Sequence, residues 1–208
     1  MAKNYRNQLS LQLLFMAFCL VVTVIGCKDL PTWFLETVPV MIGMILILFT
    51  AKRFPLTPLL AILIAGHSLI LCIGGHYTYA EVPFGYWMQD VFHFSRNHYD
   101  RIGHLAQGFV PAILAREIFI RLKVVRGAGW LFYLVICVCL SFSAFYEFIE
   151  WWTALLTGKS STAFLGTQGD IWDTQWDMFF ALVGSILAQV LLARSHDRQI
   201  EDICPKNL

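Results

Sequence analysis

The sequence predicts an all-α fold, a polytopic membrane bundle of about six transmembrane helices with a cap of loops on its outer face. Hydrophobic residues make up 58% of the 208 residues and charged residues only 14%, whereas about a quarter of a soluble domain is charged. Six apolar segments also approach the roughly 20 residues that cross a hydrocarbon layer. No repeat or linker divides the chain, so we expect a single integral membrane domain over residues 1–208.

The six spans follow from apolar runs that are separated by charged or turn-forming segments. We expect them at about residues 9–26, 34–51, 55–74, 102–121, 129–150 and 176–193. The first ends in Val24–Cys27, which resembles a lipoprotein cleavage box, so its removal as a signal peptide is left open. On the last span Ala181, Gly184 and Ala188 form a stripe of small residues, which predicts close packing against another helix.

The basic residues predict which way the chain faces. With the N-terminus inside, ten lysines and arginines fall on the inner side and four on the outer side. The inner ones are Lys3, Arg6, Lys52, Arg53, Arg121, Lys123, Arg126, Arg194, Arg198 and Lys206, and the outer ones are Lys28, Arg96, Arg101 and Lys159. We therefore expect both termini in the cytoplasm. Arg116 and Glu117, inside the fourth span, are interpreted as a pair that snorkels to the inner surface.

Tryptophan placement predicts the outer cap. Six of the seven tryptophans fall near the predicted outer interface, and only Trp130 falls near the inner one. Interfacial tryptophans are expected on both sides of a membrane, so the asymmetry predicts a thick cap built from residues 75–101 and 151–175. We expect any chemistry on this outer face.

Charge and cysteine usage argue against two classes of function. The net charge is +1 and no basic stripe is present, so nucleic acid is not an expected partner, whereas membrane lipids are. The six cysteines include no CxxC pair of a zinc ribbon or a redox motif. Cys27 and Cys72 both fall near the predicted outer face, and a disulfide between them is left open.

Three pairs of ionisable residues occur at similar predicted depth, near the outer ends of three spans. They are Asp100 and His104, Glu147 and Glu150, and Asp173 and Asp177. Residues three or four apart share one face of a helix, and an ionisable side chain inside a membrane is costly unless it has a partner or a task. We therefore interpret all six as candidate catalytic residues.

The same residues suit a divalent metal. Carboxylate oxygens favour Mg²⁺, and an added imidazole moves the preference toward Mn²⁺, Fe²⁺ or Zn²⁺. The expected ligands are Asp100, His104, Glu147, Asp173 and Asp177, with Glu150 in support and with His98, Asp170 and His76 as weaker candidates. Glu36 and His67 are further polar residues that could join the cluster.

The residues alone leave several functions open. The first is an enzyme, metal-dependent or using acid–base chemistry, that acts at the outer leaflet on a lipid-linked or amphipathic substrate. The second is a small transporter or ion-binding protein, since acids inside a membrane mark ion and proton routes. The third is a structural membrane partner in which the polar groups only fix helix packing. The substrate and the oligomeric state do not follow from the sequence.

Four segments carry a resemblance to a known family. GGHYTYAEVPFG at 74–85, RNHYDRIGHLAQG at 96–108, SAFYEFIEWW at 143–152 and GDIWDTQWDM at 169–178 resemble the YjdF family of bacterial multi-pass inner-membrane proteins. The resemblance covers nearly the whole chain, and it implies an inner-membrane location but no reaction.

A weaker similarity is to VanZ-like membrane proteins. Their Asp-basic-x-x-His start of a helix is similar to Asp100–His104, and Glu147, Asp177 and Gly184 match further positions of their motifs. Ala181 stands where that family has Asn, and Glu150 where it has Gln. This similarity covers only the last three spans.

Overall fold

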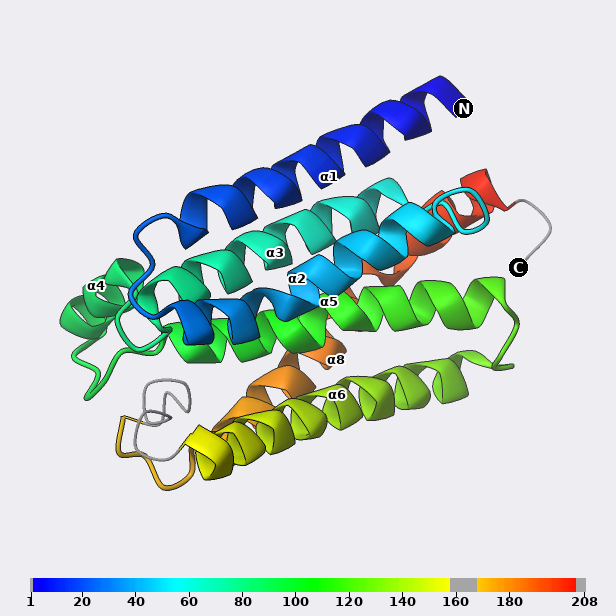
Figure 1. Ribbon diagram of the computed structural model, residues 1–208. Helices are drawn as coiled ribbons and strands as arrows, with labels where there is room; N and C mark the ends of the chain where they lie inside the picture. The colour runs from blue at the N-terminus through cyan, green and yellow to red at the C-terminus, as the bar shows by residue number, and fades with distance from the viewer. Residues whose placement is uncertain (1, 158–167, 205–208) are drawn as a thin grey trace.

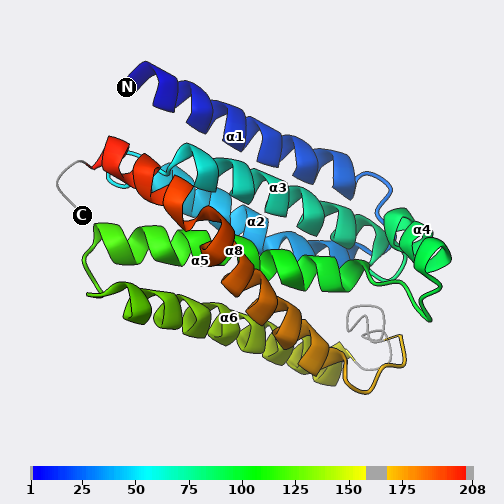
Figure 2. The same ribbon diagram turned by 180° about the vertical axis from the view of Figure 1, so that it is seen from behind.

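A computed structural model describes residues 2–157 and 168–204, which form helices and contain no strand. The helices are α1 (Ala2–Val24), α2 (Leu30–Thr50), α3 (Pro58–Tyr77), α4 (Pro83–Phe92), α5 (Tyr99–Arg121), α6 (Ala128–Thr157) and α8 (Asp173–Ile203). Six of them are long and run up and down as a bundle, while the short α4 lies at one end (Figures 1 and 2). The predicted all-α membrane bundle is confirmed.

Each of the six predicted spans lies within or largely overlaps one long helix. Five of these helices, α1, α2, α3, α6 and α8, are long and apolar enough to cross a membrane. The sixth, α5, has 23 residues, and at 1.5 Å per residue it is about 34 Å long. It is more polar because it lies inside the bundle, where it packs on α3, α6 and α8.

The structure corrects three details of the predicted elements. The cap was expected to consist of loops, but part of it is the ten-residue helix α4. The fifth span was expected to end at 150, but α6 continues into the predicted cap segment and ends at Thr157. The last span was expected to end at 193, but α8 continues through the charged segment to Ile203, since a helix does not have to end where the hydrocarbon ends.

The two ends of the bundle differ in character. The beginning of α1 and the end of α8 lie at one end, called here the terminal end, and α4 lies at the other, called the α4 end (Figure 1). The ends of α2 and α3 that carry Thr50 and Pro58 lie at the terminal end, together with those predicted inner basic residues that the structure describes. Lys159 and Lys206, which also entered the predicted orientation, lie outside the described residues.

Side-chain caps fix where two helices begin. Asp29 accepts a hydrogen bond from the Thr32 backbone N–H at 2.8 Å and starts α2 at the α4 end. Thr57 accepts one from the Leu60 N–H at 3.3 Å and starts α3 at the terminal end. In both helices a proline occupies the first turn, where its missing N–H leaves no hydrogen bond unmade.

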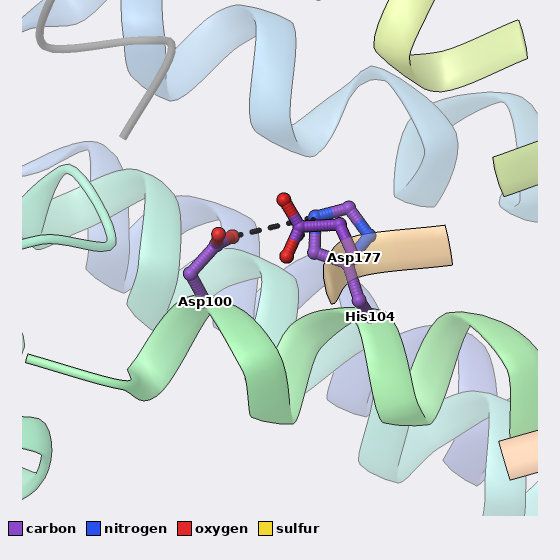
Figure 3. A group of neighbouring side chains, drawn as sticks. All are labelled: Asp100, His104 and Asp177. Atoms are coloured by element: carbon purple, nitrogen blue, oxygen red, sulfur yellow. Dashed lines mark ion pairs between the residues drawn. The ribbon is translucent and has the colours of Figure 1, made fainter. Parts of the chain in front are cut away.

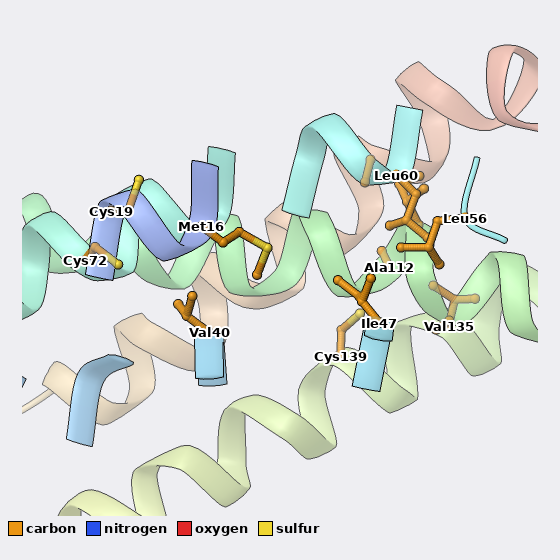
Figure 4. Close-up of a cluster of buried hydrophobic side chains, with 13 residues drawn as sticks. Met16, Cys19, Val40, Ile47, Leu56, Leu60, Cys72, Ala112, Val135 and Cys139 are labelled. Carbon is orange, nitrogen blue, oxygen red and sulfur yellow. The ribbon is translucent and has the colours of Figure 1, made fainter. Parts of the chain in front are cut away.

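An apolar core joins the six long helices along the bundle (Figure 4). It includes Met16, Val40, Leu60, Ile113 and Cys139. All six cysteines carry free thiols, so the disulfide left open between Cys27 and Cys72 is not formed in this structure.

The closest approach of two backbones is between α5 and α8. A Cβ at Gly108 would overlap the Ala181 carbonyl group, and a Cβ at Gly184 would overlap the Leu105 carbonyl oxygen. The glycines therefore allow α8 to cross directly against α5, as Figure 2 shows. This confirms the predicted small-residue packing face of the last span.

A buried ionic network ties three helices together near the terminal end. The Glu117 carboxylate is fully buried and accepts hydrogen bonds from the Thr57 hydroxyl at 2.7 Å and from Arg121 Nη1 at 2.7 Å. His196 Nε2 lies 3.0 Å from the same carboxylate. Arg116 binds Asp197 of α8 with two hydrogen bonds, at 2.6 and 3.0 Å. The predicted snorkelling pair is therefore wrong, because Arg116 and Glu117 bind different partners inside the bundle.

Candidate functional site

Three of the predicted site residues meet between α5 and α8. Asp100 and His104 lie one turn apart on α5, and Asp177 faces them from the second turn of α8 (Figure 3). His104 Nε2 is 3.5 Å from Asp100 Oδ1 and 3.8 Å from Asp177 Oδ1. One ligand atom from each residue lies within 4.8 Å of the other two. The contact between α5 and α8 thus brings two carboxylates to one imidazole nitrogen.

The hydrogen bond of His104 sets which ring nitrogen is available. Nδ1 lies 2.7 Å from Gln107 Oε1, and because an amide oxygen only accepts, Nδ1 carries the proton and donates. In the neutral ring Nε2 then carries the lone pair, and it is Nε2 that faces the two carboxylates. A hydrogen bond of this kind commonly orients an imidazole that binds a metal.

Asp177 has an oxygen without a hydrogen-bond partner. Asp177 is 2% exposed, and its Oδ1 makes no hydrogen bond to any described residue. A buried carboxylate oxygen without a hydrogen bond destabilises the fold, and a cation bound to that oxygen would offset this cost. This is the oxygen that points toward His104 Nε2.

The predicted pair of Glu147 and Glu150 lies on α6, beside this group. Glu147 and Glu150 are both 8% exposed. Glu147 has the Thr174 side chain of α8 as a hydrogen-bond partner, and its Oε1 has none among the described residues. Glu147 is close enough to His104 for their charges to interact. It therefore borders the Asp100–His104–Asp177 group without belonging to the closest set of ligand atoms.

Asp173 and Asp170, also predicted, pair with arginines of the segment before and at the start of α5. Asp173 forms a buried ion pair with Arg96, and Asp170 binds Arg101 at 3.1 Å. Arg101 also stacks 5.1 Å from the centre of the Trp176 ring. These contacts fasten the beginning of α8 to the beginning of α5.

The two weaker histidine candidates lie apart from the triad. His76 Nδ1 lies 2.8 Å from the Thr23 carbonyl oxygen, at the junction of α3 with α1. His98 packs edge-on against Phe94. Burial, and after it the positive charges of Arg101 and Arg96, lowers the pKa of His98, so its ring favours the neutral form.

A cavity of about 650 Å³ adjoins the triad. Asp100, His104 and Glu150 line its polar part together with Glu36 and His67, the two further residues named from the sequence. The Tyr146 hydroxyl of α6 donates a hydrogen bond of 2.8 Å to Glu36 Oε2 of α2. Most of the remaining wall is formed by aliphatic and aromatic side chains.

Three contributors were missed by the sequence reasoning. Gln107 lies three residues after His104, so helical spacing could have identified it. Tyr146 bonds to a residue 110 positions away, and Arg96 to one 77 positions away. No local pattern marks such pairs, since they depend on how the helices pack.

Comparisons with known proteins agree with this architecture. A family model described as "Predicted membrane protein (DUF2238)" matches residues 8–198. The chain is 51% identical over 187 residues to "Inner membrane protein YjdF" of Escherichia coli (strain K12), covering 90% of each chain. No solved structure matches the chain. The similarity to VanZ-like proteins stays a prediction from the motifs alone.

The same findings support a location in the inner membrane. The relative is named as an inner membrane protein, and five helices of this chain are apolar enough to cross a membrane. The family match covers nearly all of the chain, including every residue of the triad. The chain belongs to the family of multi-pass membrane proteins designated DUF2238, which includes the inner-membrane protein YjdF.

Proposed function

We propose that this protein is a membrane-embedded enzyme that uses a divalent metal, held by Asp100, His104 and Asp177, on a lipid-linked or amphipathic substrate at the outer leaflet. The observation that carries the proposal is the buried Oδ1 of Asp177, which has no hydrogen-bond partner among the described residues and lies 3.8 Å from His104 Nε2. A cation would compensate both carboxylates and accept the lone pair of Nε2.

The ligand atoms of the triad suit a divalent transition metal. Two carboxylate oxygens and one imidazole nitrogen fit Zn²⁺, Mn²⁺ or Fe²⁺ better than Ca²⁺, which takes six to eight oxygen ligands. Mg²⁺ fits less well because of the nitrogen. Three protein ligands leave coordination positions for water and substrate, as in catalytic rather than structural sites. When bound, such a metal supplies Lewis-acid chemistry and an activated water.

The surrounding residues have separate roles under this proposal. Gln107 holds the His104 ring with Nε2 toward the carboxylates. Glu147, beside the triad and with Oε1 unpaired, is the residue for proton transfer. Arg96 and Asp173 hold the start of α8 in register with α5.

Metal content tests the proposal. Protein purified in detergent is expected to contain about one equivalent of a transition metal by elemental analysis, and the Asp100→Ala/His104→Ala variant is expected to lose it while staying folded. Asp90→Asn is the matched control, because Asp90 is an exposed acid of α4 outside the triad. The proposal fails if neither the wild type nor Asp90→Asn holds metal after supplementation with Zn²⁺, Mn²⁺ and Fe²⁺.

The transporter alternative has less support. An ion would have to pass from His67 to the terminal end, but there the cavity wall consists of side chains such as Ile64, Leu114 and Ile118. The next ionisable groups on α5 are Arg116 and Glu117. Arg116 already binds Asp197, and Glu117 already has hydrogen bonds from Thr57 and Arg121. Apolar lining over this distance suits a hydrocarbon chain better than an ion.

The proposal includes an orientation, with both termini in the cytoplasm and the triad near the outer face. It is supported by the basic residues at the terminal end. A green fluorescent protein fused after Leu208 is expected to fluoresce, and alkaline phosphatase fused at the same place is expected to be inactive. Active phosphatase at this position would reverse the orientation and move the site to the inner leaflet.

A further inference from the structure

We infer that the cavity beside the triad binds a single hydrocarbon chain of the substrate, which enters sideways from the bilayer between α2 and α6. The placement of the substrate head group at the triad rests on the proposed function, whereas the placement of the chain does not. The inference follows from the polarity, the length and the opening of the cavity.

The polar lining is confined to one part of the cavity. From the α4 end down to the level of His67 and Gln107, the wall carries carboxyl, imidazole, phenol and amide groups. Beyond that level the lining residues are apolar on every contributing helix, for example Leu46 on α2, Phe119 on α5 and Val138 on α6. A molecule that matches this wall has a polar head and an apolar tail.

The apolar part is long in the direction of the helix axes. On α5 it extends from Gln107 to Phe119, which corresponds to about 18 Å of helix at 1.5 Å per residue. This is more than half of a hydrocarbon layer about 30 Å thick. The cavity volume of about 650 Å³ lies within the range of about 300–1,000 Å³ that is usual for small-molecule sites. One extended chain fits this shape better than a compact apolar group.

The cavity opens at the surface that faces the bilayer. α2 packs on α1 and α3, whereas α6 packs on α5 and α8, so α2 and α6 form opposite walls. Ile42 of α2 and Phe142 of α6 both line the cavity and are 51% and 61% exposed. The hydrogen bond from Tyr146 to Glu36 bridges the two walls at the polar level. A chain can therefore enter below this bridge without leaving the hydrocarbon.

Gly43 offers a direct way to fill the apolar part. It lines the cavity, and a Cβ added there would meet no atom of any described residue within 4 Å. Gly66 of α3 is the matched control. In the described part of the chain a Cβ there also meets no atom within 4 Å, but Gly66 does not line the cavity. Gly43→Phe should occupy the path of the chain, and Gly66→Phe should leave it open.

The experiment uses the full chain in nanodiscs and hexadecyl phosphate with a diazirine at the end of its chain. Photolabelling of wild type is expected on cavity residues toward the terminal end, such as Leu46 and Phe119. Gly43→Phe should reduce this labelling about tenfold, while Gly66→Phe should leave it unchanged. Gly43→Leu, a smaller plug in the same space, replaces Gly43→Phe if that variant does not fold.

The results separate the two proposals. Equal labelling of folded Gly43→Phe and wild type, or equal loss in Gly66→Phe, overturns the chain site. Elemental analysis of the same samples reports on the metal independently. If the protein contains no metal but Gly43→Phe abolishes the cavity labelling, the chain site is supported and the metal centre is rejected. If the protein contains metal but Gly43→Phe leaves the labelling unchanged, the metal centre is supported and the chain site is rejected.

Discussion

Gly108→Ala is expected to destabilise the protein, although alanine normally favours a helix more than glycine does. A Cβ at this position overlaps the Ala181 carbonyl, which is backbone and cannot rotate away. α8 must then move off α5, which we expect to cost about 3 kcal/mol. This corresponds to a fall in Tm on the order of 10 °C for a chain of this size. Thermal unfolding in one detergent, followed by circular dichroism, measures it.

Gly66→Ala is the control for this change. Among the residues that the structure describes, the added Cβ meets no atom within 4 Å, so the Tm should stay the same or rise slightly. The ligands of the proposed metal centre are divided between α5 and α8, so Gly108→Ala should also lower the metal content. An unchanged Tm for Gly108→Ala would mean that the two helices are not held in backbone contact.

Glu117→Ala is the second change for which we expect a large effect. It leaves Arg121 and His196 buried without their shared carboxylate, and it removes the partner of the Thr57 hydroxyl. Removing one partner of a buried ion pair costs about 3–5 kcal/mol. We expect a fall in Tm of about 10 °C or more, measured as for Gly108→Ala.

Two further variants show whether the loss of stability in Glu117→Ala comes from the buried ionic network around Glu117. Glu201→Ala removes an exposed acid near the end of α8 and should leave the Tm within about 2 °C of wild type. Glu117→Gln keeps the shape and one acceptor oxygen, so its loss should be smaller than that of Glu117→Ala. Equal stability of Glu117→Ala and wild type would contradict a structural role for this carboxylate.

The spans could be predicted because hydrocarbon selects apolar runs, but their ends could not. α8 continues ten residues past the predicted 193 because helical hydrogen bonds persist in water once the helix is formed. Hydropathy also does not report the short α4, which has only ten residues. Arg116 and Glu117 were misinterpreted because adjacent opposite charges suggest a pair, whereas neighbours in a helix point in different directions.

Part of the candidate site could be predicted for a local reason. Asp100 and His104 are four residues apart, so a helix alone brings them together. Asp173 and Asp177 have the same spacing, yet only Asp177 reaches His104 while Asp173 binds Arg96. Which of the two aspartates reaches His104 depends on the level at which α8 crosses α5. Gly108 and Gly184 permit this crossing, but no local sequence pattern predicts its level.

Under the proposed function, sideways entry between α2 and α6 means that the concentration of substrate in the membrane, and not in water, controls the turnover rate. A substrate that arrives through hydrocarbon is diluted by other lipids, not by water, so turnover should follow its mole fraction in the membrane. Adding inert phospholipid at a fixed total amount of substrate should then slow the reaction, while changing the aqueous volume should not. Diffusion in the plane of the leaflet would set the upper limit of the encounter rate.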